Sequence, residues 1–196
     1  MNDENLARQH RHPIDPGPQK RWARRLPVPF KSQISEDPEI RGQICSPVSV
    51  AMVLDYWGVR FKNASVRQAV WDPEYKIYGS WSRAIEAAYT FGLAGYLERF
   101  DDWNQVKHYI AADQALIASV KIAKGQLHSD PDRQSSGHLL VIAGFDEQGN
   151  VYVNDPAYSA TAQGRTIYSQ KEMEDIWLAN GGLGYVLRAV GFPLKP

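Results

Sequence analysis

The pattern of apolar residues changes about halfway along the chain. Residues 45–57 are apolar on almost every side at helical spacing, which is typical of a buried helix. Further helices are predicted, in chain order, at about residues 65–70, 80–91 and 102–112. Beyond residue 112, short β-branched runs replace the helical spacing. The pattern therefore predicts helices in the first half and strands in the second.

The first of these helices has recognisable ends. Pro47 suits the first helical position, where its missing N–H costs nothing, so Ser46 is the expected N-cap. Gly58 is the expected residue just past the helix end. These ends place Cys45, the single cysteine of the chain, at the positive end of a buried helix.

The second half reads as strands with one further helix. Strands are predicted at about residues 115–121, 138–145, 150–155, 166–168 and 185–190. A capping box formed by Ser169 and Glu172 opens a helix to about Leu178. Helices followed by a mostly antiparallel sheet define an α+β fold of two layers.

Composition and charge narrow the classes of function. Lys and Arg number 22, as do Asp and Glu, so no net field favours nucleic acid or an anionic membrane. One cysteine excludes an internal disulfide and a cysteine-rich zinc site. No apolar run approaches the ~20 residues of a membrane span, and no signal peptide is expected from the first residues.

The length fits a single domain preceded by a tail. Residues 1–26 are basic, contain prolines and have few apolar residues, so we interpret them as a tail or linker. Residues 27–196 form the predicted domain. His128 lies in a polar loop with Asp130 and Asp132, but these three residues make a poor metal site.

Cys45 has two interpretations. A lone cysteine is most often a small buried apolar residue. A helix N-terminus, however, lowers the pKa of a thiol and favours the nucleophilic thiolate. Catalysis would also require a base and a residue that orients the base.

A predicted hairpin supplies both. His138 begins one strand and Asp155 ends its partner. With a four-residue turn at 146–149, two residues face each other across the hairpin when their numbers add up to 295. The side chains of His138 and Asp155 then become diagonal neighbours on one face. A five-residue turn would put them on opposite faces. Asn154 is an alternative orienting residue, but it alternates to the other face.

These residues match the requirements of a thiol hydrolase. A carboxylate bonded to one imidazole nitrogen fixes the tautomer and supports an imidazolium, and the other nitrogen takes the thiol proton. The chain order Cys45, His138, Asp155, with the nucleophile on a helix and the other two on a sheet, is that of papain-like enzymes.

Several motifs together resemble a known family. They are Gln33 after Val28-Pro29-Phe30, the run from Cys45 to Leu54 leading to Tyr56-Trp57-Gly58, Gly137-His138, and Val153-Asn154-Asp155-Pro156. At this spacing the chain is similar to the bacteriocin-processing peptidase-like group of papain-like cysteine peptidases, in its stand-alone bacterial branch. The likeness covers roughly residues 27–190.

The resemblance implies roles for individual residues. Cys45 would be the nucleophile, His138 the general base and acid, and Asp155 the orienting residue. The side chain of Gln33 would help the N–H of Cys45 to hold the oxyanion. Gln43, two residues before the cysteine, is the alternative to Gln33 because residues 35–42 lengthen the usual gap.

We therefore expect a cysteine peptidase that forms a thioester and acts on a peptide or protein, without metal or organic cofactor and without nucleic acid. An acyltransferase or deamidase with the same triad, and a catalytically silent binding domain, are the alternatives. The resemblance favours an exported bacterial protein. The sequence leaves the cleavage site and the oligomeric state open.

Overall fold

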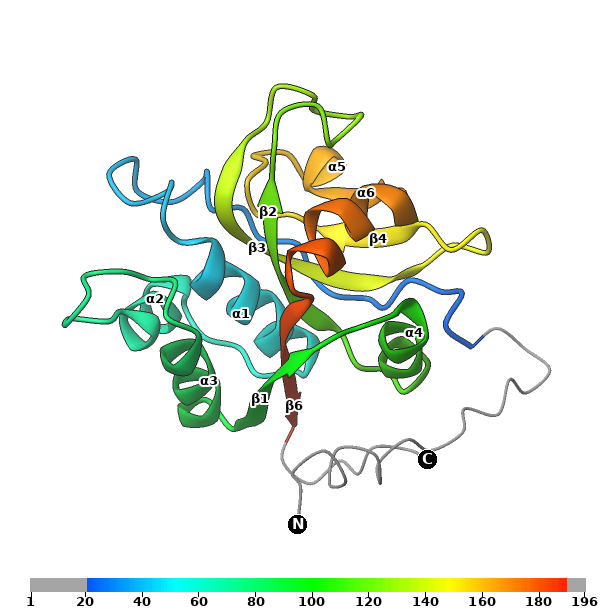
Figure 1. The fold of residues 1–196 in the computed structure, drawn as a ribbon. Helices are drawn as coiled ribbons and strands as arrows, with labels where there is room; N and C mark the ends of the chain where they lie inside the picture. The colour runs from blue at the N-terminus through cyan, green and yellow to red at the C-terminus, as the bar shows by residue number, and fades with distance from the viewer. Residues whose placement is uncertain (1–20, 190–196) are drawn as a thin grey trace, which may run out of the picture.

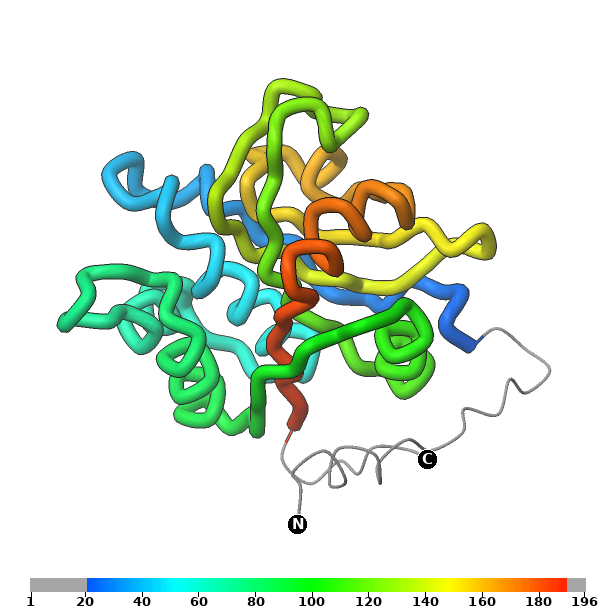
Figure 2. The backbone as a smooth tube through the Cα atoms, viewed as in Figure 1, coloured from blue at the N-terminus to red at the C-terminus, as the bar shows by residue number. Residues whose placement is uncertain are grey.

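The computed structural model describes residues 21–189 (Figures 1 and 2). Its helices are α1 (Cys45–Tyr56), α2 (Asn63–Val70), α3 (Trp81–Thr90), α4 (Trp103–Ala111), α5 (Thr161–Gly164), α6 (Gln170–Ile176) and the 3₁₀ helix η2 (Leu178–Asn180). Its strands are β1 (Leu93–Arg99), β2 (Leu116–Ile122), β3 (Ser135–Phe145), β4 (Val151–Asn154), β5 (Arg165–Tyr168) and β6 (Leu183–Ala189). The α+β fold predicted from the sequence is confirmed.

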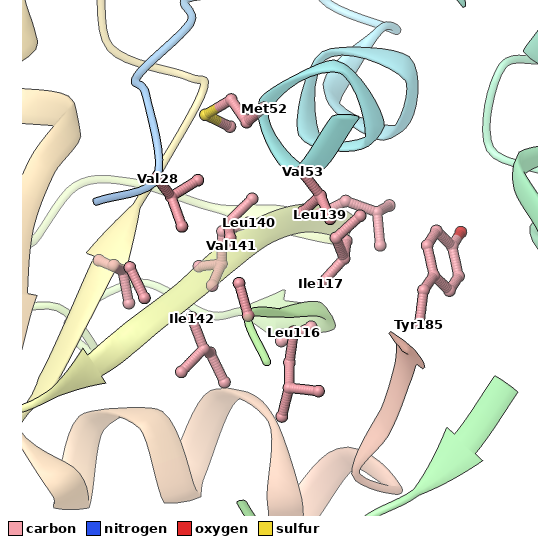
Figure 3. Packing of buried hydrophobic residues seen from close by; sticks show 14 of the residues in the cluster. Val28, Met52, Val53, Leu116, Ile117, Leu139, Leu140, Val141, Ile142 and Tyr185 are labelled. Atoms are coloured by element: carbon pink, nitrogen blue, oxygen red, sulfur yellow. The ribbon is translucent and has the colours of Figure 1, made fainter. Parts of the chain in front are cut away.

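The strands form one sheet in the order β1-β6-β2-β3-β4-β5, and all its pairs are antiparallel. Strand β3 lies near the middle, and its residues from His138 to Phe145 are all buried. Figure 3 shows why: α1 lies on one side of β3 and α6 on the other. A strand covered on both faces becomes a continuous apolar run rather than an alternating one.

Helix α1 joins the sheet next to the predicted active residues. Its residues from Ser46 to Leu54 are buried, as the apolar pattern predicted. Within this contact, the hydroxyl of Ser49 donates to the carbonyl of Leu139 on β3 at 3.2 Å. Helices α2 and α3 lie beside α1 in Figure 1. The hydrogen bond from Ser49 to Leu139 fixes the N-terminal half of α1 against β3.

The start of α1 differs from the prediction in one respect. The helix begins at Cys45 with Ile44 in the N-cap position, and no side chain caps it. Pro47 is therefore the third helical residue and Ser46 is not the N-cap. A proline is accepted anywhere in the first turn, because those N–H groups lack helical acceptors in any case. Gly58, at φ 79°, ends the helix as predicted.

The β3–β4 hairpin reaches the predicted pairing by an unexpected route. The turn spans five residues, 146–150, because Phe145 pairs with Val151. A bulge between Ile142 and Gly144 then shifts the register by one residue. Val141 consequently pairs with Asn154, and their residue numbers add up to 295, as the predicted pairing requires. The predicted turn was wrong, but the predicted pairing near His138 and Asp155 is right.

A chain segment lies against this bulge. The N–H of Leu26 donates to the carbonyl of Ala143 at 2.7 Å, and the N–H of Phe145 donates to the carbonyl of Arg24 at 3.0 Å. Gly144 has φ 141°, and a Cβ there would lie 1.9 Å from the Arg24 carbonyl oxygen. Only glycine allows this approach. The rest of the predicted tail lies mostly outside the described residues, and the boundary at residue 27 stays a prediction.

The sequence pattern missed strand β1. Its segment contains Ala94, Gly95 and Glu98, residue types that are depleted in strands. The strand forms because it pairs along its whole length with β6, from Leu93 with Ala189 to Arg99 with Leu183. It is an edge strand with several exposed side chains. Tertiary pairing therefore outweighs the local preference.

Candidate active site

Cys45 is the first residue of α1, and its thiol faces His138. The sulfur accepts from the imidazole of His138 and from the N–H groups of Ser46 and Leu139. Burial alone would raise the pKa of the thiol. The hydrogen bond and positive charge of His138, together with the two backbone donors, outweigh burial and lower that pKa. The site therefore favours the thiolate.

His138 connects the thiol to a carboxylate. Its Nε2 lies 2.8 Å from Oδ1 of Asp155, which leaves Nδ1 for Cys45. The side chain is buried, and burial disfavours its charged form. The charge and hydrogen bond of Asp155, aided by Cys45, nevertheless raise the pKa of His138 to about 9. The site therefore favours the charged form of His138 beside a thiol whose pKa is lowered.

Asp155 lies just after β4 and is completely buried. Its Oδ1 accepts from His138, from the N–H of Ala157 at 3.0 Å and from Nη2 of Arg133 at 3.1 Å. Its Oδ2 accepts from Nη1 of Arg133 at 2.5 Å and from the hydroxyl of Tyr168 at 3.0 Å. Burial raises its pKa, but these neighbours, His138 first, hold the pKa well below its usual range. The carboxylate stays ionised.

Gln33 lies next to the same turn. Its N–H donates to the carbonyl of Pro156 at 2.9 Å, one residue beyond Asp155. Its side chain is buried, and Nε2 donates to the carbonyl of Arg41 at 2.8 Å. One of the two N–H bonds of Nε2 is thus used. Gln43 is exposed, so the structure places Gln33 rather than Gln43 in the interior beside the Asp155–Pro156 turn.

Asn154, the alternative orienting residue, points elsewhere. Its Nδ2 donates to the carbonyl of Val28 at 3.0 Å, and its Oδ1 accepts from Arg25 at 3.4 Å. The amide therefore holds the extended segment before Gln33 against β4. This is the other face of the strand, as alternation predicted.

The sequence pattern did not identify Arg133 and Tyr168 as partners of Asp155. Arg133 lies in a polar loop, 22 residues before the carboxylate, and Tyr168 ends the next strand. Neither residue belongs to a motif. Tyr168 could have been found only by extending the hairpin register to β5, where it faces Val151.

Other predicted features have simpler roles. His128 is exposed, and its N–H and Nδ1 lie 2.7 and 3.0 Å from Oε1 of Glu172. Residues 21–189 hold no group of three or more His, Cys, Asp or Glu side chains arranged for a metal ion. Within the same range, none of the helices combines the length and the apolar character that a membrane crossing requires.

The sequence matches one protein-family model. Residues 25–185 match the Peptidase_C39 like family. The chain belongs to this family. It is a papain-like cysteine peptidase, as the sequence resemblance predicted. A search of curated proteins finds no match to the sequence.

Solved structures with the same fold include three peptidases. A C39-like peptidase from Bacillus anthracis is 14% identical, with 86% of this chain and 96% of that chain covered and a TM-score of 0.61. The double glycine motif protease of an AMS/PCAT transporter, solved with a leader peptide, is 18% identical, with 85% and 94% covered and a TM-score of 0.56. The peptidase domain of Streptococcus ComA is also 18% identical, with 76% and 93% covered and a TM-score of 0.55.

Proposed function

We propose that this peptidase cleaves its substrate through a triad of Cys45, His138 and Asp155. The observation that carries the proposal is the position of the His138 ring, which contacts the thiol with one nitrogen and Asp155 with the other. A nucleophile, a base and an orienting group in this sequence of contacts are sufficient for acyl transfer to a thiol. The wider family membership supports the peptidase chemistry.

The reaction proceeds in two stages. The Cys45 thiolate attacks the amide carbonyl, and the imidazolium of His138 donates its proton to the leaving amine. This step leaves a thioester on the sulfur. His138, now neutral, takes a proton from water, the water attacks the thioester, and the thiolate and imidazolium are restored. Asp155 holds the ring in one tautomer throughout.

The oxyanion of each tetrahedral intermediate requires donors near Cys45. The N–H of Cys45 lies in the first turn of α1, where helical N–H groups have no intrahelical acceptor. We assign the second donor to Gln33, whose Nε2 retains one N–H after it donates to Arg41. Burial of Gln33 makes such a donor effective, because water does not compete for it.

The triad predicts a defined dependence on pH. The thiolate–imidazolium pair forms above the pKa of Cys45, which the site lowers, and persists until His138 loses its proton near pH 9. We expect kcat/KM to form a plateau through neutral pH and to fall as the pH rises through about 9. The rate of thiol alkylation by iodoacetamide reports the same pair without any substrate.

Two experiments test the proposal. Alkylation is measured against pH for the wild type and His138→Ala; the variant should react slowly at neutral pH and titrate as an ordinary thiol. Equal labelling of both at neutral pH would contradict the triad. A diverse peptide library, including sequences with two adjacent glycines, is then incubated with the wild type and with Cys45→Ala.

The library experiment separates the alternatives. Hydrolysis mapped by mass spectrometry, and lost in Cys45→Ala, supports a peptidase. Amide products that appear only with an added amine would indicate a transferase, and conversion of glutamine to glutamate would indicate a deamidase. Absence of any reaction, together with alkylation that does not depend on His138, would favour a binding domain.

A further inference from the structure

Arg133 is a largely buried cation next to the triad. It lies between β2 and β3, and its side chain is only 10% exposed. Both terminal nitrogens contact Asp155, Nη1 to Oδ2 at 2.5 Å and Nη2 to Oδ1 at 3.1 Å. This is the paired geometry in which a guanidinium binds a carboxylate most strongly. Asp155 therefore faces two cations, the His138 imidazolium and the Arg133 guanidinium.

We propose that Arg133 is a positioning residue that keeps Asp155 ionised throughout the reaction and weakens the hold of Asp155 on the proton of His138. The inference rests on the proposed triad. Arg133 lies outside the triad, and in this proposal it controls the step in which His138 protonates the leaving amine.

The first argument is the charge of the buried carboxylate. When His138 gives up its proton, Asp155 would become a fully buried anion without a cation. Such a charge is strongly disfavoured, so Asp155 would otherwise resist this step. An arginine side chain does not lose its proton in proteins. Burial lowers the pKa of Arg133, but the charge and hydrogen bonds of Asp155 outweigh burial and raise that pKa. The guanidinium therefore neutralises Asp155 in both protonation states of His138.

The second argument is competition for the carboxylate. Oδ1 accepts from both His138 and Arg133, and Oδ2 is used by Arg133 and Tyr168. A carboxylate whose charge is shared between two cations stabilises each of them less than it would alone. Arg133 therefore makes the imidazolium a better acid. Without the guanidinium, His138 would keep its proton to higher pH.

The surroundings hold the guanidinium in place. The ring of Tyr158 lies 5.1 Å from its central carbon, and the Tyr158 hydroxyl donates to Asp130 at 3.1 Å. Nη1 also contacts the Tyr168 hydroxyl at 3.3 Å. Among residues 21–189, the titratable groups around the His138–Asp155 pair are Cys45 on α1, Arg133 and Asp130 before β3, Tyr158 after β4, Tyr168 on β5 and Tyr185 on β6.

The test measures the pKa of His138 directly. The wild type, Arg133→Gln and Arg133→Lys are labelled with isotopes, and the imidazole is titrated by NMR. Arg83→Gln is the matched control, since it removes an arginine paired with Asp72 and Glu86 away from the triad. Removing a charge at this distance should raise the pKa of His138 in Arg133→Gln by roughly one unit.

The conservative variants complete the test. Arg133→Lys keeps the charge and should titrate within about 0.3 units of the wild type, as should Arg83→Gln. A merely structural role of Arg133 would leave the pKa of His138 unchanged in every folded variant. A pKa in Arg133→Gln equal to or below the wild-type value would therefore overturn the proposal.

Arg133→Met keeps the proposal testable if Arg133→Gln does not fold. This variant removes the same charge beside Asp155 and leaves an apolar side chain in the largely buried position, so it should also raise the pKa of His138. In that case an unchanged pKa of His138 in Arg133→Met would reject the proposal. The NMR titration requires no turnover, so it can fail or succeed independently of catalysis. Failure of the proposed triad is instead read from alkylation of His138→Ala.

Discussion

The proposed site has two sides that are built differently: a base side with His138 and Asp155, and an oxyanion side with Gln33. On the base side, Asp155 accepts five hydrogen bonds from four residues and is completely buried. On the oxyanion side, the side-chain oxygen of Gln33 is buried without a hydrogen-bond partner among residues 21–189. Within the same described range, its amide nitrogen donates to one acceptor, the carbonyl of Arg41, which belongs to the loop at residues 34–42.

This contrast indicates which structural elements position the residues of each side. Strands β3, β4 and β5 position the base side, so it is complete before substrate arrives. The oxyanion side depends on a loop connected to α2 through Glu36, which pairs with Arg67 at 3.1 Å and accepts from Asn63 at 2.8 Å. Partly exposed contacts of this kind contribute little individually. We therefore expect the base side to control stability as well as rate, and the oxyanion side to control mainly the rate.

The largest effect should follow from Asp155→Asn. The amide retains one acceptor oxygen, cannot neutralise Arg133 and favours the wrong tautomer of His138. We expect kcat/KM to fall by about 10⁴ and the free energy of unfolding by about 3 kcal/mol, because a buried cation loses its partner. Peptide hydrolysis and urea denaturation measure the two quantities.

Asp101→Asn is the control for this variant. Asp101 is exposed and lies 3.9 Å from Arg99, so neither quantity should change appreciably. If Asp155→Asn kept its activity within tenfold of the wild type, Asp155 would not be the orienting residue.

Gln33→Ala should separate rate from stability. Removal of one oxyanion donor lowers kcat by about 10²- to 10³-fold. The free energy of unfolding should change by only about 1 kcal/mol, because one hydrogen bond is lost together with a buried unpaired oxygen. Alkylation of Cys45 should keep its dependence on pH. Gln43→Ala is the matched control, and a comparable loss of kcat there would reassign the donor to Gln43.

The sequence predicted the contact between His138 and Asp155 because that contact rests on strand alternation. His138 and Asp155 were placed on one face from the hairpin pattern, although the turn has five residues rather than four. The bulge at Ala143 compensates for the extra residue, and it accompanies contacts with Arg24 and Leu26 that are distant in sequence. No local pattern encodes such a bulge, so the prediction of the turn failed while the pairing was right.

Features that depend on tertiary contacts were not predictable. Strand β1 forms against β6 despite its unfavourable composition. Arg133 joins Asp155 only because the loop before β3 folds over the end of β4. Ser46 was expected to cap α1, but the helix already begins at Cys45. For β1 and Arg133, a contact between segments distant in sequence decides the structure.

The smallest effect should come from Glu36→Ala, which weakens the oxyanion side without touching the amide of Gln33. The variant removes the acceptor for Arg67 and Asn63, so the loop that carries Arg41 is held less firmly against α2. We expect kcat to fall by about threefold, the free energy of unfolding to fall by at most about 1 kcal/mol, and alkylation of Cys45 to stay unchanged.

Glu39→Ala is the matched control, since Glu39 carries the same charge and is exposed in the same loop. It should leave kcat unchanged. If Glu36→Ala and Glu39→Ala had equal kcat, the contact with α2 would not position Gln33. The bond from the N–H of Gln33 to the Pro156 carbonyl would then be sufficient to place it, and the oxyanion side would share the rigidity of the base side.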